Sequence, residues 1–107
     1  MQIPINESDW KLFRTKLPRW QEAHMERLNQ EYAALLASSD SASEKFWALE
    51  KRINTDKQSV GVIARMSRSN MYHNISSLLS EHVITLDDLA DFSEEMRNRM
   101  AFAARES

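Results

Sequence analysis

Hydrophobic residues recur at the spacing of an α-helix along the first third of this chain. The recurring positions are Trp10, Phe13, Leu17 and Trp20, followed by Met25, Leu28, Tyr32 and Leu35. Asn6 is of a residue type that caps helices, because its side chain can accept a hydrogen bond from a first-turn N–H such as that of Asp9. Ile5 and Trp10 have the spacing of a hydrophobic staple across this start. The pattern therefore predicts a helix that begins near residue 7.

Pro18 falls inside this helical pattern. Proline has no backbone N–H to donate, and its ring crowds the carbonyl group four residues back, which is that of Arg14. We therefore expect a kink or a break at Pro18. Two interpretations remain open: one kinked helix over about residues 7–37, or two helices that meet near Leu17.

A polar linker over residues 38–43 separates this segment from a second helical one. Ser41 and Glu44 have the spacing of a capping box, in which each side chain bonds to the other residue's backbone N–H. The helix that follows is expected to extend to about Asp56. Its apolar side chains are expected to face inward, namely Phe46, Leu49 and Ile53, with Trp47 beside them.

The segment between residues 59 and 80 carries two apolar sets that point to different sides. A projection at about 100° per residue separates Met71, Tyr72, Ile75, Leu78 and Leu79 from Val62, Ile63 and Met66. One straight amphipathic helix cannot bury both sets, so a break is expected between Ser67 and Asn70; a central helix buried on all sides is the alternative. Residues 59–70 also alternate weakly like a strand, but we favour a helix or an irregular segment.

A last helix is expected from Thr85 onward. Thr85 and Asp88 have capping-box spacing, and Ile84 can pack onto Leu89 as a staple. Acidic residues lead this segment and arginines follow, which is the order that the helix dipole favours. Its apolar face is formed by Leu89, Phe92, Met96, Met100 and Ala103.

The composition favours a single all-α domain over residues 1–107. A chain of 107 residues is near the commonest domain size and is long enough to bury one core. One Gly and two Pro supply few tight turns, which favours helices joined by short polar loops. We expect a small bundle of four to five helices.

Several classes of protein are disfavoured by what the sequence lacks. The chain has no Cys, which excludes disulfides, thiolate metal sites and cysteine nucleophiles. No apolar run approaches the roughly 20 residues of a membrane span, and the first residues lack the regions of a signal peptide. We expect a cytoplasmic protein with no membrane partner. The net charge of −2 also disfavours a protein that relies mainly on phosphate contacts.

No catalytic constellation can be assembled from the sequence. His73 and His82 are nine residues apart, which is not the i, i+4 spacing of a helical metal pair, and His24 stands alone. The carboxylate pairs at residues 87–88 and 94–95 fit solvated helix ends. One glycine, Gly61, cannot supply a phosphate-binding or oxyanion loop. We expect neither enzymatic activity nor a metal or cofactor.

A basic segment carries the alternative functional hypothesis. It contains Lys51, Arg52, Lys57, Arg65 and Arg68, opposed mainly by Asp56. Residues 62–65 followed by residues 67–72 resemble a helix-turn-helix, and this resemblance implies that Ser67, Arg68, Asn70 and Tyr72 face the major groove and backbone of DNA. The turn is about three residues shorter than the motif requires. A nucleic-acid-binding regulator is therefore the alternative.

Aromatic and Met residues carry the leading hypothesis. Three Trp, four Phe, two Tyr and six Met are residue types favoured at interfaces, and Trp20 and Trp47 fit the helical stripes least securely. The sequence therefore predicts a small non-enzymatic protein–protein interaction module, such as a regulator, inhibitor or antitoxin-like binder, with a protein partner or self-association. The predicted partner-binding residues are Trp20, Trp47, Lys51, Arg52, Arg65, Arg68, Asn70 and Tyr72.

Over nearly its full length the chain also resembles a group of short bacterial proteins whose activity is uncharacterised. The similar stretches are residues 20–23, 46–53, 67–71, 84–89 and 92–93. The resemblance implies a bacterial, cytosolic, stand-alone helical protein, and it implies no activity, substrate or site.

Overall fold

The computed structural model describes the backbone of residues 5–106 and the side chains of residues 5–104. Within that range it contains five α-helices, one 3-10 helix and no strand, so the all-α prediction is confirmed. In chain order the elements are α1 (Glu7–Leu36), α2 (Ala42–Asp56), α3 (Val60–Ile63), α4 (Met71–Ser80), η1 (Leu86–Leu89) and α5 (Glu94–Glu106).

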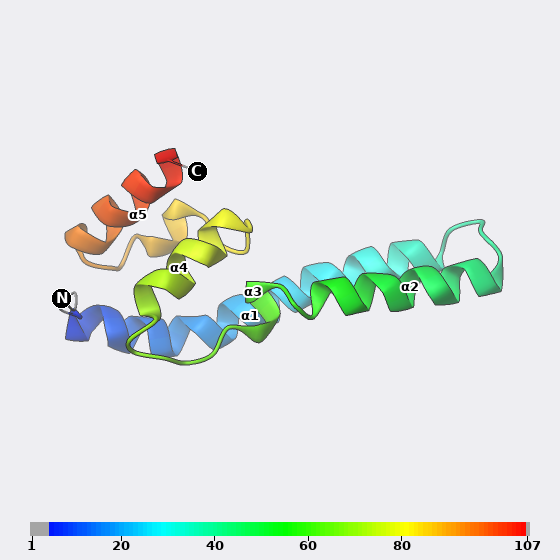
Figure 1. Ribbon diagram of the computed structural model, residues 1–107, viewed down its shortest axis with the longest axis horizontal. Coiled ribbons are helices and arrows are strands. Elements are labelled where there is room, and N and C mark those ends of the chain that lie inside the picture. The colour runs from blue at the N-terminus through cyan, green and yellow to red at the C-terminus, as the bar shows by residue number, and fades with distance from the viewer. Residues whose placement is uncertain (1–4, 107) are drawn as a thin grey trace.

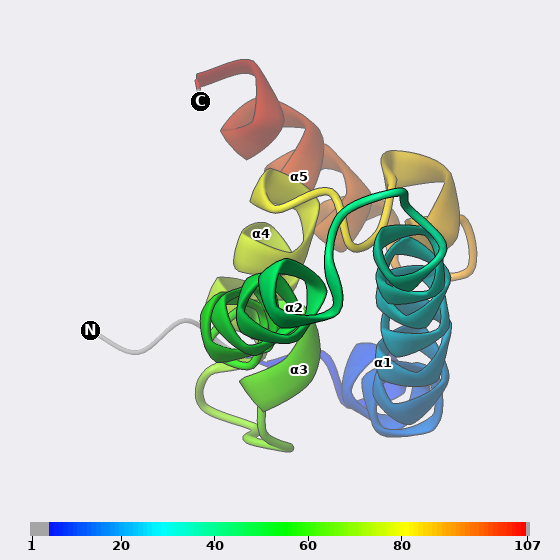
Figure 2. The ribbon, with the colours of Figure 1, turned by 90° about the vertical axis from the view of Figure 1, so that its right-hand side faces the viewer.

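The molecule is elongated, with principal extents of 53 × 25 × 24 Å. Its Cα radius of gyration is 16.7 Å, whereas a compact domain of this length is expected to have about 13 Å. The reason is visible in Figures 1 and 2: α4, η1 and α5 pack on the first half of α1, and the second half of α1 projects away beside α2. We call residues 25–57 the arm and the rest of the fold the body.

The hydrophobic core lies in the body. Its buried side chains come from α1, from α4, from the segment around η1 and from α5, and they are Phe13, Leu17, Met71, Ile75, Leu78, Val83, Ile84, Leu89, Phe92, Met96 and Met100. Most of these are the positions that helical spacing predicts to be apolar faces. The body therefore follows the periodicity of the sequence closely.

A buried carboxylate joins the starts of α1 and α5. Asn6 caps α1 as predicted, because its side chain accepts a 3.1 Å hydrogen bond from the N–H of Asp9. Asp9 is only 1% exposed, and its two carboxylate oxygens accept from Ser93, at 2.8 Å from the N–H and 2.6 Å from the hydroxyl. The Ser93 hydroxyl oxygen in turn accepts from the N–H of Met96 at 3.1 Å. The Asp9 carboxylate thus lies at the N-termini of both α1 and α5, where the helix dipole favours an anion.

α1 runs through Pro18 without a break, over 30 residues. The two-helix interpretation is therefore wrong, and the single-helix interpretation is the correct one. Pro18 is exposed, so the carbonyl of Arg14 that loses its helical partner can be satisfied by water. Leu17 is buried on the other side of the helix and keeps the chain helical through its packing. The predicted break between Ser67 and Asn70 is confirmed, because α3 ends before it and α4 begins after it.

The predicted last helix is divided in the structure. The capping box of Thr85 and Asp88 forms, with 2.7 Å from the Thr85 N–H to the Asp88 carboxylate, but it starts only the short η1. α5 begins separately at Glu94, with Ser93 as its cap. The single-helix prediction is wrong because Ser93 bonds to Asp9, and such side-chain bonds compete with helix continuation.

Candidate protein-binding surface

The second helix exposes the side chains that its sequence pattern predicts to be inside. No residue of α2 is buried. Phe46 is 63% exposed and Ile53 is 42% exposed, so the inward prediction is wrong for these two residues. Trp47 beside them is 64% exposed. The side of α2 that is half-buried instead carries Lys45, Ala48, Leu49, Arg52 and Asp56. α2 packs mainly on one neighbour, α1, and a single helix cannot cover a wide apolar stripe.

The exposed apolar side chains of α2 continue onto α1. Ile53 lines a groove of about 280 Å³ together with Met25, Leu28 and Tyr32 of α1 and Val62 of α3. Leu36, which is 48% exposed, lies on the same side of α1 by helical spacing. We define the arm face as the six residues Met25, Leu28, Tyr32, Leu36, Phe46 and Ile53. It runs along both helices of the arm.

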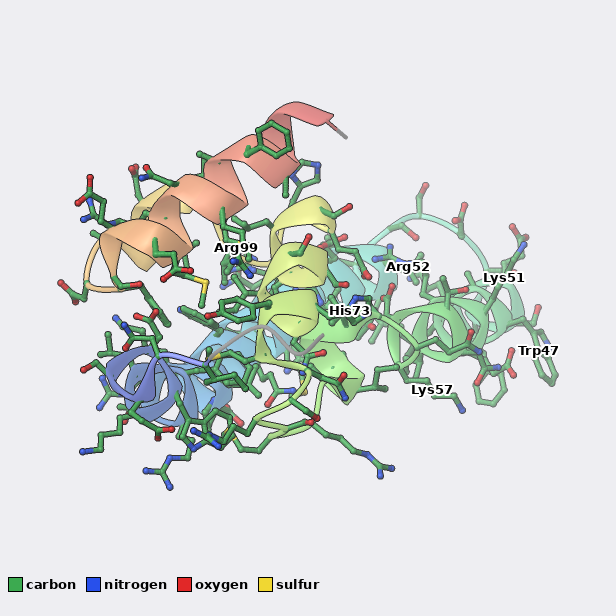
Figure 3. All side chains as sticks on the ribbon, turned by 60° about the vertical axis from the view of Figure 1, so that its left-hand side comes forward. Trp47, Lys51, Arg52, Lys57, His73 and Arg99 are labelled. Atoms are coloured by element: carbon green, nitrogen blue, oxygen red, sulfur yellow. The ribbon has the colours of Figure 1, made fainter. Side chains whose placement is uncertain are left out.

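An aromatic pair stands near the outer end of the arm. The rings of Phe46 and Trp47 meet edge to face, with centroids 5.0 Å apart and an interplanar angle of 86°. Figure 3 shows Trp47 at the extremity of α2, pointing away from the rest of the fold. Such a pair keeps both rings ordered while their outer surfaces stay open to solvent.

A polar network joins the two helices of the arm. The Tyr32 hydroxyl donates to Asp56 at 2.6 Å, and the Arg52 guanidinium donates to Glu31 at 2.9 Å and to Asp56 at 3.5 Å. The same guanidinium lies over the Tyr32 ring, 5.7 Å from its centroid. Burial and the hydrogen bond to Asp56 raise the pKa of Tyr32 to about 12. The network sets how α2 is rotated against α1, and so which side chains form the arm face.

The raised pKa of Tyr32 gives a direct test of this network. In a Tyr72→Phe background, the phenolate absorbance of the remaining tyrosine should titrate with a midpoint near 12. The pKa of Tyr32 in the folded protein exceeds its usual value of about 10. The hydrogen bond from Tyr32 to Asp56 therefore stabilises the fold fully below about pH 10, and this stabilisation is lost as the pH rises through the pKa of the folded protein. Asp56→Asn should lower the midpoint, since it removes the acceptor's charge. Glu50→Gln, on the exposed side of α2, is the matched control and should leave it unchanged.

The predicted basic residues are not brought together. Lys51 is exposed on α2, Arg52 belongs to the arm network, and Arg65 lies in the linker before α4. Arg68 forms an ion pair with Glu7 at the start of α1, in the body. Lys51, Arg52 and Lys57 lie along α2 in Figure 3, whereas the others lie on different elements. The basic segment is therefore divided between arm and body.

The stretch that resembles a helix-turn-helix has a different local structure. α3 is a single turn of four residues, and Ser67 and Arg68 lie in the linker outside any helix. Asn70 is the residue before α4. Tyr72 is packed against the core, and the Arg99 guanidinium lies 4.7 Å from its ring centroid. The four residues are thus not presented together on one recognition helix.

The two tryptophans singled out in the sequence lie in different environments. Trp20 packs against the core and stacks on Phe92, with ring centroids 6.2 Å apart. Trp47 is exposed. Sequence reasoning missed the arm face, whose signal is the helical spacing of Met25, Leu28, Tyr32 and Leu36 on α1 and the seven-residue spacing of Phe46 and Ile53 on α2.

The three histidines lie in three different places, and His82 lines a depression between α4 and α5. His73 borders an open polar depression of about 310 Å³ with Arg65, Asn74 and Glu81. The His24 ring lies against buried Gly61 of α3, with its Nε2 3.4 Å from the Ser59 hydroxyl. Among the described side chains, residues 5–104, no group of three or more His, Asp or Glu is arranged to hold a metal ion.

None of the described helices has both the length and the apolar character needed to cross a bilayer. No protein-family model matches the chain, and no curated protein and no solved structure matches it either.

Proposed function

We propose that this chain is a small non-enzymatic protein–protein interaction module that binds its partner through the arm face. The observation that carries the proposal is the exposure of Phe46 and Trp47, each more than three-fifths open to solvent on a helix with no buried residue. Aromatic side chains are enriched at the centres of interfaces, and they often supply most of the binding energy.

The shape of the arm supports the same conclusion. The groove beside Ile53 is concave and is lined mainly by apolar side chains, so it can receive side chains of a partner. The hydrogen bonds of Tyr32 and Arg52 hold the two helices in register before a partner arrives. A surface ordered in advance loses less conformational entropy on binding.

The hypothesis of a nucleic-acid-binding regulator has less support. Arg52 and Arg68 are both paired with carboxylates of the chain itself. Phosphate binding would have to compete with these ion pairs.

Photo-crosslinking in cells tests the proposed function. A photoreactive phenylalanine derivative at position 47 should give a discrete protein crosslink, because Trp47 adjoins the arm face. The matched control is the same amino acid at Gln30, an exposed position on α1 that helical spacing places away from the arm face. Equal crosslinking at both positions, or none at position 47, would contradict the proposal.

A further inference from the structure

We infer that the partner on the arm face is a second copy of this chain, so that two arms form a four-helix bundle. This inference rests on the proposed function and specifies its partner. Three observations point to a second copy: the surface area of the chain, the geometry of the arm, and the charges of its two helices.

The chain exposes more surface than a compact monomer does. Its accessible area is 7432 Å², whereas a folded monomer of 12.5 kDa is expected to expose about 6,200 Å². The difference is about 1,200 Å². Each partner of a standard interface contributes about 800 Å², which is less than this difference. The elongated outline and the unburied α2 place much of this extra surface on the arm. Pairing of two arms would remove enough of it for a stable dimer.

The arm has the geometry of half a four-helix bundle. Two antiparallel helices joined by a short loop present one shared face, with Met25, Tyr32 and Leu36 on α1 and Phe46 and Ile53 on α2. Helical spacing places Glu50 and Lys57 on the same side of α2, so the face is apolar with two charges within it. A twofold axis brings the same surface of each copy into contact, so one apolar face is sufficient for a closed dimer. Four-helix bundles bury such stripes in a common core. No second protein is needed to complete this arrangement.

The two helices of the arm carry net charges of opposite sign. Within the arm, α1 carries Glu26 and Glu31 against Arg27, and Glu22 lies one turn before the arm. Arg27 donates to the carbonyl of Val83 in the body, and Glu31 is paired with Arg52 of the same chain. From residue 42 to residue 57 there are four basic residues against three acidic ones: Lys45, Lys51, Arg52 and Lys57 against Glu44, Glu50 and Asp56. A second copy can bring Glu22 and Glu26 of one α1 near the lysines of the other copy's α2. This complementarity favours α1 of one copy lying against α2 of the other.

The oligomeric state of the purified chain tests the inference. Sedimentation equilibrium of the wild type at about 100 µM, well above the micromolar range of a modest interface, should give twice the chain mass. Phe46→Lys with Ile53→Lys should give a monomer with unchanged helical circular dichroism, because both side chains lie on the arm face and neither is buried. Gln30→Lys is the matched control and should remain a dimer.

Charge exchange tests the pairing of unlike helices. Glu22→Lys with Glu26→Lys should weaken the dimer, and so should Lys57→Glu, because each opposes like charges. An equal mixture of the two variants should recover a heterodimer, since every contact between α1 and α2 is then between opposite charges. Failure of the mixture to associate would overturn this pairing.

Two results would overturn the inference as a whole. One is a monomeric wild type at this concentration. The other is a dimer that Phe46→Lys with Ile53→Lys leaves intact. A monomer that still crosslinks to a different protein from position 47 rejects the second copy and retains the proposed function, whereas the absence of any crosslink from position 47 counts against both.

Discussion

Asp9→Ala is expected to lower the free energy of unfolding by about 3 kcal/mol, because two hydrogen bonds to a buried charge are lost and the Ser93 N–H loses its acceptor. Asp9 is almost fully buried, so water cannot readily replace the carboxylate. Urea unfolding, monitored by circular dichroism, measures this loss of stability. The slope of the transition should stay the same if the surface exposed on unfolding is unchanged.

Two comparisons separate this interaction from the general effect of removing an acid. Asp91→Ala removes an exposed carboxylate that lies 3.6 Å from the Lys16 ammonium, and it should change stability by less than about 0.5 kcal/mol. Asp9→Asn keeps the shape of the side chain without its charge, and its loss of stability should fall between those of Asp9→Ala and Asp91→Ala. If Asp9→Ala proves as mild as Asp91→Ala, the link between α1 and α5 contributes little.

Gly61→Ala is expected to lower the free energy of unfolding by about 2 kcal/mol, since overpacking at a buried contact has a cost of this size. A methyl group at this position would overlap the imidazole ring of His24. Gly61 therefore allows α3 to approach α1 closely, and the contact also brings Ser59 beside the ring. Urea unfolding of the purified variant measures the loss.

A double variant distinguishes this overlap from a general effect of alanine. His24→Ala removes the ring that the new methyl group would meet. Gly61→Ala should therefore have a smaller effect in the His24→Ala background than in the wild type, and the difference should exceed about 0.5 kcal/mol. Additive effects of the two substitutions would show that the ring is not the obstacle.

Local sequence signals predicted the helix starts well. Asn6 caps α1 and the full capping box of Thr85 forms, as their spacing indicates. Ser41 also caps its helix, accepting from the Glu44 N–H at 3.2 Å, but the Glu44 carboxylate accepts from the Ser41 hydroxyl. These interactions involve residues only three apart, so the sequence contains everything that determines them. The buried faces of α4 and α5 also follow from spacing, because the body supplies a surface for each stripe.

Long-range contacts explain most of what the sequence did not reveal. The last helix is divided because Ser93 bonds to Asp9, which is 84 positions away in the chain. α1 continues through Pro18 because packing on the buried side outweighs one lost backbone bond. The residues around Ser93 do not reveal its bond to Asp9, and the residues around Pro18 do not reveal the packing that keeps α1 helical.

The candidate site could be predicted only in part. Trp47 was named as a candidate partner-binding residue, but Phe46 and Ile53 have the spacing of buried residues and were placed inside. Helical spacing indicates that residues share a face, and it does not indicate whether a neighbour covers that face. The arm face is open because only α1 packs closely against α2, which is a property of the topology.

The continuity of α1 has a mechanical consequence. Its 30 residues correspond to a rod about 45 Å long at the usual rise per residue, and the rod begins in the core and ends at the arm's outer loop. A force applied near that loop is therefore transmitted along one helix towards Phe13 and Leu17, and it passes the missing backbone hydrogen bond at Pro18 on the way. The core contacts of Phe13 and Leu17 therefore resist a displacement of the arm's outer end.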